Sequence, residues 1–244
     1  MKDKLRKVIL FICVCVFVYS AVQLGIIFYD YYMIEKETNE IVNEYVEEPE
    51  TEEEVNPLSR VVNFTELQKT NEDVIGWLYI PNTKVDEPIL KGETNDTYLR
   101  TDIYKKSNKA GSIFIDEINN VDFKDDNTII YGHNMKNGSR FHALKQFVEA
   151  DYFKENRYVY IYLPDGTVSV YDIYGADIIS AYSDLYRKGI DYQKYIKEVL
   201  ADCNQKTEVS EEQAPLIMLS TCYTGTDDRY VVFARLKENV KVGE

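Results

Sequence analysis

The feature that most constrains this 244-residue chain is an apolar run near its N-terminus. Residues 8–29 contain no charged side chain, and they follow the basic sequence Lys2-Asp3-Lys4-Leu5-Arg6-Lys7. A helix of this length spans roughly 33 Å, which is enough to cross a bilayer core of about 30 Å. Because basic residues precede the run, we expect residues 1–7 to be a cytoplasmic tail and residues 8–29 a membrane anchor, with the rest outside the cell.

A cleaved secretory signal is the alternative to an anchor. The apolar core of such a signal is normally about 7–15 residues long, and a small-x-small cleavage site follows it. Residues 8–29 form a longer run, and no clean site of this kind follows them. The pattern therefore favours an anchor that is retained.

The charge is distributed unevenly along the chain. It totals −14, of which residues 1–7 contribute +3, residues 30–56 contribute −10 and the remainder −7. The acidic segment includes Glu47-Glu48-Pro49-Glu50-Thr51-Glu52-Glu53-Glu54, and such a run repels itself and cannot bury a core. We therefore expect residues 30–56 to be a solvated extracellular stalk. The acidic cluster lacks the spacing of a calcium-binding loop, so we predict no metal site. No basic stripe indicates nucleic acid, so we predict no nucleic-acid partner. We also predict no cofactor.

Residues 57–244 are long enough for one domain with its own core. Cys13 and Cys15 fall in the predicted anchor, which leaves Cys203 and Cys222 outside the membrane. A disulfide between these two would suit an exported protein. However, Cys203 ends a predicted helix, Cys222 ends a predicted strand, and pairing would consume the better nucleophile. We therefore interpret Cys203 as a small buried apolar residue.

Short runs of β-forming residues dominate the predicted domain. Helices are predicted over 66–74, 140–147 and 192–203, and Leu163-Pro164-Asp165-Gly166 is a strong hairpin signal. The pattern predicts a mainly β fold with inserted helices, in which the strands close or nearly close a barrel. The predicted strands, about eight in all, are 76–80, 85–90, 112–116, 128–131, 158–162, 168–179, 216–221 and 230–236.

Three side chains at predicted strand ends form a set suited to acyl transfer. Cys222 follows the strand 216–221, and Arg229 opens the next strand after six intervening residues. His133 follows the strand 128–131. A thiolate is a nucleophile, an imidazole protonates a leaving amine, and a guanidinium, which stays charged, stabilises an oxyanion. A backbone N–H near Cys222 is a candidate second donor to that oxyanion.

Each of these side chains also has a simpler interpretation. Cys222 alone fits a buried apolar residue, the pair Gly132-His133 fits a turn, and Arg229 fits an ion pair with a neighbouring aspartate. His142 is the other histidine of the chain. Its apolar neighbours on the predicted short helix indicate a residue on the helix surface.

Taken together, these residues resemble the sortases, the membrane-anchored cysteine transpeptidases of Gram-positive bacteria. Residues 128–135 (TIIYGHNM) resemble the histidine segment of the family, and residues 219–222 (LSTC) resemble the end of its T-L-x-T-C motif. Residues 229–232 (RYVV) are similar to its arginine strand. The resemblance extends over residues 76–236 and implies a closed, eight-stranded sortase-type barrel.

Within the family, the chain is most similar to class B. Helix-forming sequence precedes the barrel, and the helix 192–203 interrupts the connection before the cysteine strand. The segments 109–114 (KAGSIF) and 132–139 (GHNMKNGS) are also similar to class B sequences. This likeness implies a sorting signal of the N-P-x-T type, and an L-P-x-T-like signal is the alternative.

The resemblance implies a mechanism and a set of site residues. Cys222 attacks the threonine carbonyl of a sorting signal on a secreted protein, Arg229 stabilises the oxyanion, and His133 protonates the departing amine. A thioester acyl-enzyme remains, and an amine of peptidoglycan, or a pilin lysine, resolves it. The residues expected to line the sorting-signal groove are Asn95, Leu99 and Ser220.

Two positions depart from the family pattern. Met218 stands where the T-L-x-T-C motif has its first threonine, and the connection from Cys222 to Arg229 is short, which makes Arg235 an alternative arginine.

Three other functions remain open. A pilin-polymerising sortase would use a lysine acceptor, although no lid-like insert precedes the barrel. In a papain-like protease the cysteine precedes the histidine, the reverse of this order. A non-catalytic surface module would make the three residues a coincidence.

Overall fold

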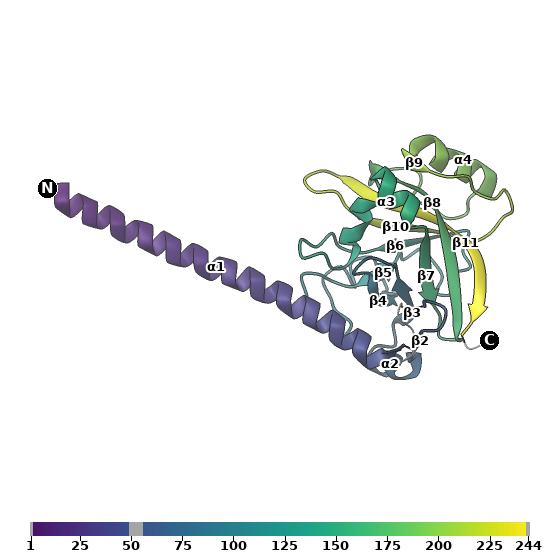
Figure 1. Cartoon of the computed structure of the whole chain (residues 1–244), viewed down its shortest axis with the longest axis horizontal. Helices are drawn as coiled ribbons and strands as arrows, with labels where there is room; N and C mark the ends of the chain where they lie inside the picture. The colour runs from purple at the N-terminus through teal and green to yellow at the C-terminus, as the bar shows by residue number, and fades with distance from the viewer. Residues whose placement is uncertain (1, 49–55, 243–244) are drawn as a thin grey trace. The chain divides into compact units, whose positions relative to one another are not determined.

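The computed structural model describes residues 2–48 and 56–242, and its contacts divide the chain into two units, Met1–Glu40 and Ile41–Glu244 (Figure 1). The first unit consists of most of a single helix, α1 (Lys2–Tyr45). This helix is long and apolar enough to cross a membrane, by its length and composition. These properties are those of a membrane anchor or a signal sequence.

The structure differs from the prediction that residues 30–56 are a solvated stalk. Ile41 and Tyr45, one helical turn apart, are buried in the second unit with exposures of 5% and 4%. The two-residue strand β1 (Val46–Glu47) then pairs with β2 (Val61–Val62). The compact unit therefore begins at Ile41 and not at residue 57. The acidic residues 49–54 of the predicted stalk lie outside the described residues.

Within the described residues, eight strands form a closed barrel. In the order in which they pair they are β11, β10, β6, β5, β4, β3, β7 and β8, and β8 pairs back with β11. Most neighbours are antiparallel, whereas β6 with β10 and β4 with β5 are parallel. The prediction of a closed barrel is confirmed. The bounds are β3 Val74–Tyr79, β4 Asp86–Leu90, β5 Ile113–Ile115, β6 Asn127–Tyr131, β7 Tyr158–Tyr162, β8 Thr167–Ser180, β10 Leu216–Cys222 and β11 Asp228–Lys241.

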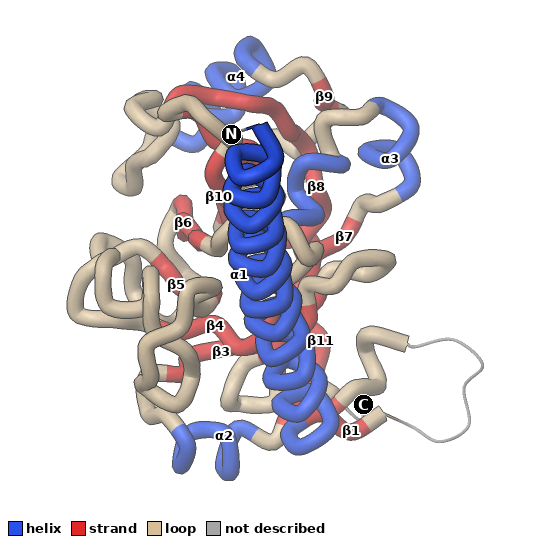
Figure 2. The backbone as a smooth tube through the Cα atoms, turned by 90° about the vertical axis from the view of Figure 1, so that its left-hand side faces the viewer, coloured by secondary structure: helices blue, strands red, loops and turns tan. Residues whose placement is uncertain are grey.

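Short helices surround the barrel. Helix α2 (Phe64–Thr70) and helix α4 (Tyr192–Asp202) lie at opposite ends of it (Figures 1 and 2). A 3₁₀ helix, η1 (Phe141–Gln146), follows the loop after β6, and α3 (Ala150–Glu155) comes next. Neither α3 nor the short strand β9 (Gln205–Lys206), which pairs with β8, is predicted from the sequence.

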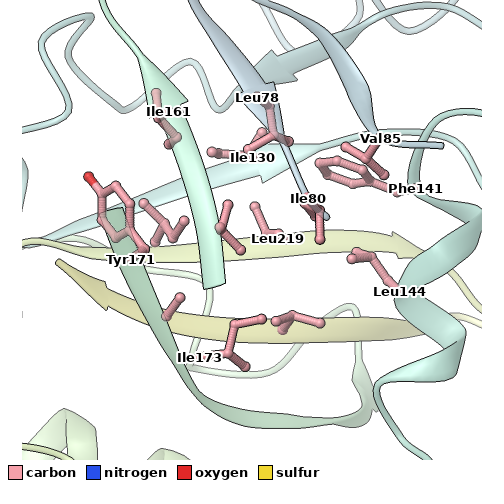
Figure 3. Close-up of a cluster of buried hydrophobic side chains, with 14 of the residues drawn as sticks. Leu78, Ile80, Val85, Ile130, Phe141, Leu144, Ile161, Tyr171, Ile173 and Leu219 are labelled. Atoms are coloured by element: carbon pink, nitrogen blue, oxygen red, sulfur yellow. The ribbon is translucent and has the colours of Figure 1, made fainter. Parts of the chain in front are cut away.

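Aliphatic side chains from facing strands fill the barrel (Figure 3). Leu78, Ile130, Ile161 and Leu219 come from four different strands, and each is fully buried. Because strand side chains alternate between the two faces, every second residue points inward. Burying such a side chain contributes about 1.5–3 kcal/mol, so the barrel is a firm frame for residues at its strand ends.

Helix α4 packs on the outside of β8. A Cβ on Gly175 would lie 3.2 Å from Val199 Cγ1 and 3.3 Å from Cys203 Sγ, so the missing side chain lets the helix approach closely. Cys203 is 2% exposed, and its thiol is free. The interpretation of Cys203 as a buried apolar residue is confirmed.

Candidate active site

A pocket of about 320 Å³ lies where β6 and β10 end and β11 begins. Because β6 and β10 are parallel, with Tyr131 beside Ser220, their C-terminal ends reach the same edge of the barrel. The segments that follow the two strands therefore meet there. The pocket lining includes all six residues that the sequence singles out, namely Asn95, Leu99, His133, Ser220, Cys222 and Arg229.

The β10–β11 hairpin brings the thiol and the guanidinium together. Cys222 and Arg229 are direct cross-strand partners. The next pair outward is hydrogen-bonded, because Tyr223 N–H donates to the Asp228 carbonyl at 3.0 Å. Hydrogen-bonded and non-hydrogen-bonded pairs alternate, so Cys222 and Arg229 form the second kind, in which Cα atoms lie about 4.5 Å apart. The short connection thus places Cys222 directly opposite Arg229. The Tyr223 N–H is already bonded to the Asp228 carbonyl, so this backbone group is not free to be the second donor to the oxyanion.

Two arginines on β11 have different surroundings. Arg229 lines the pocket, and its Nη1 donates to the backbone carbonyl of Asp228 at 2.9 Å. Arg235 lies towards the other end of the β10–β11 ladder, where its guanidinium donates to the Tyr192 hydroxyl at 2.9 Å and to the Glu212 carbonyl at 2.8 Å. The alternative that Arg235 serves the site is therefore wrong.

One ring nitrogen of His133 is held by the backbone. His133 Nε2 lies 2.6 Å from the carbonyl oxygen of Leu99. A carbonyl only accepts hydrogen bonds, so Nε2 carries a hydrogen and Nδ1 is the nitrogen left for proton transfer. The loop that follows is closed by a bond from Phe141 N–H to the His133 carbonyl at 2.9 Å. His133 is thus oriented by a main-chain group, as an aspartate orients the histidine of other acyl-transfer enzymes.

Tyrosines form one wall of the pocket. Ser220 is 1% exposed, and its hydroxyl lies 2.7 Å from the hydroxyl of Tyr186. The Tyr186 ring stacks on Tyr131, with 6.4 Å between centroids and 13° between planes. Burial raises the pKa of Tyr186 to about 12, and Cys222 adds to this while Ser220 and Arg229 oppose it. The hydroxyl therefore lies within electrostatic reach of both the thiol and the guanidinium.

The sequence does not single out Tyr186 as a site residue. The chain contains 21 tyrosines, and those on strands are expected to pack the barrel. Tyr186 lies between β8 and α4, in a segment without a clear periodic pattern. Its place in the long connection that precedes the cysteine strand is the signal that the sequence offers.

Asn95 is fixed by a reciprocal pair of hydrogen bonds. Its backbone N–H donates to Glu117 Oε2 at 3.0 Å, and its Oδ1 accepts from the Glu117 N–H at 2.8 Å. The amide oxygen of Asn95 is therefore engaged, and its NH₂ group is the part left for a ligand. Among residues 2–48 and 56–242, no group of three or more histidine, cysteine, aspartate and glutamate side chains is arranged to hold a metal ion.

A second histidine lies next to the site. Asn134 Nδ2 donates to the Cys222 carbonyl at 2.9 Å, and Asn134 Oδ1 lies 2.7 Å from His142 Nδ1. His142 is half-buried, and its pKa is lowered by burial and by the nearby Lys145 charge. The prediction of a simple helix-surface residue is therefore wrong, because η1 folds back over the loop that follows His133.

Comparison with known proteins identifies the family of this chain. The sortase domain family matches residues 78–237. The chain belongs to the sortase family. Sortase B of Listeria monocytogenes is 35% identical to it over 167 residues, which cover 66% of this chain and 68% of that protein. Sortase B of Staphylococcus aureus is 28% identical over 186 residues, which cover 71% and 74% of the two chains.

Solved structures agree with this assignment. Sortase B from Bacillus anthracis superposes with a TM-score of 0.72 at 28% identity, over 88% of this sortase and 99% of that chain. A class B sortase of Streptococcus pyogenes involved in pilus biogenesis gives 0.68 at 26% identity, over 72% and 98%. This sortase is a class B-like cysteine transpeptidase, and its substrates are proteins with sorting signals.

Proposed function

We propose that this sortase cleaves an N-P-x-T-like or L-P-x-T-like signal of secreted proteins and transfers them to an amine of the cell-wall peptidoglycan. The observation that carries this proposal is that Cys222, His133 and Arg229 line one pocket at the barrel edge. A nucleophile, a proton donor and a fixed cation around one cavity are the groups that thiol-mediated acyl transfer requires.

The first half-reaction forms a thioester. The reaction starts from a Cys222 thiolate and a His133 imidazolium. The thiolate sulfur attacks the threonine carbonyl carbon, and the carbonyl π electrons move to the oxygen. Collapse of this intermediate breaks the bond from carbon to the next residue's nitrogen, and His133 Nδ1 gives that nitrogen its proton. The bond from His133 Nε2 to the Leu99 carbonyl stabilises the imidazolium that holds this proton before transfer.

Arg229 serves the negative oxygen of the intermediate. The guanidinium keeps its charge at all working pH values, so it acts as a hydrogen-bond donor and not as an acid. Nη1 is engaged with the Asp228 carbonyl, which anchors the group and leaves its other N–H donors for the substrate. A donor fixed before the reaction needs no reorganisation when charge develops.

The second half-reaction resolves the thioester. An amine attacks the thioester carbonyl, His133 Nδ1 accepts the amine's proton, and the carbon–sulfur bond breaks to release the Cys222 thiolate. A new amide bond links the secreted protein to the acceptor, and the starting protonation states are restored. The acceptor must therefore present an uncharged amine when it enters the site.

The signal itself would lie along the pocket wall. Leu99 supplies exposed apolar surface, Asn95 supplies its NH₂ group, and Ser220 contributes through its contact with the Tyr186 hydroxyl. Helix α1 would anchor the enzyme with residues 1–7 in the cytoplasm and the barrel outside, because basic residues precede its apolar part. Both substrates of the reaction would then meet the enzyme at the outer membrane face.

A peptide assay tests this proposal directly. Full-length enzyme in detergent is mixed with quenched fluorescent peptides that carry N-P-x-T or L-P-x-T cores, with and without an added amine. We expect cleavage of at least one peptide, a new amide product when the amine is present, and no cleavage by Cys222→Ala. Cleavage by the Cys222→Ala variant at the wild-type rate, or of neither peptide by the wild type, would refute the proposal.

A pilin lysine is the second candidate acceptor. The likeness to the Streptococcus pyogenes sortase involved in pilus biogenesis supports it. The same assay separates the two acceptors, because a lysine side-chain amine and a peptidoglycan stem peptide give products of different mass. Faster product formation with the lysine peptide would favour the pilin alternative.

A further inference from the structure

The second histidine of the chain is connected to the nucleophile through one amide group. Asn134 Nδ2 donates to the Cys222 carbonyl at 2.9 Å, and Asn134 Oδ1 lies 2.7 Å from His142 Nδ1. These two contacts join η1 to the end of β10. Asn134 is also the residue next to His133, so the same amide links the segments that carry the imidazole and the thiol.

The chemistry of these groups fixes the direction of both bonds. A backbone carbonyl has no hydrogen to give, so Asn134 must present its NH₂ group to Cys222 and its oxygen to His142. That oxygen requires a donor, and His142 therefore carries a hydrogen on Nδ1. A side chain without a hydrogen-bond donor at position 142 would leave the Asn134 amide free to rotate.

The Cys222 carbonyl needs this support because of where β10 ends. In the non-hydrogen-bonded pair with Arg229, the Cys222 carbonyl points away from β11. On its other side β6 has already ended at Tyr131, so no strand faces the carbonyl there. The Asn134 amide takes the place of the missing strand and holds the peptide that follows the thiol.

We propose that His142 is a positioning residue for the transpeptidation described above. It orients the Asn134 amide, which holds the Cys222 backbone at a fixed place relative to His133. The inference rests on the proposed function of the same pocket, and His142 acts only through Asn134. Small displacements of reacting groups are costly, and a misplacement of about 1 Å can slow a reaction about 100-fold.

Four variants and a control test this role. His142→Ala removes the donor, whereas His142→Asn places an amide NH₂ near the former Nδ1. Asn134→Ala removes the bridge, and the double alanine variant completes a cycle. The control is Gln146→Ala, an exposed residue of the same helix. All proteins are full-length, in detergent, with Cys13 and Cys15 replaced by serine.

Two readouts are measured for each variant. The first is peptide cleavage, for which we expect kcat to fall about tenfold in His142→Ala with KM within about twofold, and to recover in His142→Asn. The second is the rate of Cys222 alkylation by iodoacetamide at pH 7. We expect this rate to fall in His142→Ala and to recover in His142→Asn. In the Asn134→Ala background, His142→Ala should lower neither kcat nor the alkylation rate any further. Gln146→Ala should match the wild type in both readouts.

Three results would overturn the inference. They are wild-type rates in a folded His142→Ala protein, equal losses in the alanine and asparagine variants, and losses that multiply in the double variant. Thermal unfolding monitors folding, and a change in the unfolding midpoint with unchanged kcat would mean a purely structural role. If the wild type cleaves no peptide, the proposed function fails, while the alkylation cycle still decides whether His142 positions Cys222.

Discussion

Cys222 and Arg229 lie directly opposite each other across the β10–β11 hairpin, at a position where the backbones exchange no hydrogen bonds. Side chains at such positions are the closest cross-strand neighbours in an antiparallel pair. The six-residue connection is therefore what brings the guanidinium to the thiol, and it does not separate them. Arg229 is the group whose geometry this hairpin controls most directly.

Replacing Arg229 by lysine should lower kcat/KM for peptide cleavage about 100-fold, because a point ammonium cannot reproduce the planar set of donors. The matched control is Arg235→Lys on the same strand. Arg235 donates to Tyr192 and Glu212 away from the pocket, so this change should leave kcat/KM near the wild-type value. Steady-state kinetics with the best fluorescent peptide provide the comparison, and wild-type turnover by Arg229→Lys would contradict the role of the guanidinium.

The hydrogen bond that His133 Nε2 donates to the Leu99 carbonyl gives a second prediction, which is tested at Gly111. Gly111 has a φ of +53°, and a Cβ there would lie 2.5 Å from the Leu99 carbonyl oxygen. Gly111→Ala should displace this carbonyl, release His133 Nε2 and reduce kcat by about tenfold or more.

Gly166→Ala is the control for this prediction. Gly166 has a φ of +80° in the β7–β8 hairpin, with open space where a Cβ would be. Both alanine variants share the cost of a left-handed backbone, about 1–2 kcal/mol, but only the first meets Leu99. Both should therefore unfold at lower urea concentrations, and only Gly111→Ala should lose kcat. A folded Gly111→Ala enzyme with wild-type kcat would show that the Leu99 bond is dispensable.

Much of this architecture follows from local sequence patterns. Strands such as 158–162 and 216–221 are short, strongly β-forming runs with clear limits, so their existence is predictable and their ends shift by only a residue or two. The site residues follow for a related reason. His133, Cys222 and Arg229 each stand at the end or start of such a strand, and the closed barrel brings those ends together.

The remaining features depend on contacts that a linear pattern does not contain. The Leu99 carbonyl that orients His133 is a backbone group 34 residues away, and any residue type supplies it. The contact between His142 and Asn134 depends on how a loop turns back on itself. The burial of Ile41 and Tyr45 is not predictable from the acidic composition of residues 30–56. Net charge describes a whole segment, whereas burial concerns one face of a helix.

This burial predicts where the stable domain begins. An enzyme that starts at Glu35 keeps Ile41, Tyr45 and β1, whereas one that starts at Pro57 loses them. The shorter protein also loses the bond from Asn63 N–H to the Tyr45 carbonyl, at 2.8 Å, and the one between Tyr45 and Thr70, at 2.8 Å. Burial of two large apolar side chains contributes about 3 kcal/mol or more.

Urea unfolding of the two truncated proteins measures this difference. The protein that starts at Pro57 should have a free energy of unfolding lower by about 3 kcal/mol, which is a fall of roughly 6–12 °C in the thermal midpoint. Substituting Ile41 and Tyr45 by alanine in the longer protein should reproduce most of the loss. Equal midpoints for the two truncations would show that the end of α1 adds nothing to the domain.

The buried thiol of Cys203 gives a prediction about alkaline pH. Burial raises its pKa from an ordinary 9.0 to about 12, so the unfolded chain releases this proton at lower pH than the folded protein does. A raised folded pKa contributes stability that is fully present below about pH 9 and is lost as pH rises towards 12.

The variant Cys203→Ala lacks this contribution. It also leaves a small cavity beside Gly175, which lowers the free energy of unfolding by about 1 kcal/mol at pH 7. The stability advantage of the wild type over Cys203→Ala should therefore shrink between pH 8 and pH 11. Urea midpoints measured for both proteins in a Cys222→Ala background isolate the effect, because all other titrating groups are shared and cancel in the difference. An advantage that stays constant across this range would mean that the Cys203 thiol ionises as readily in the folded domain as in the unfolded chain.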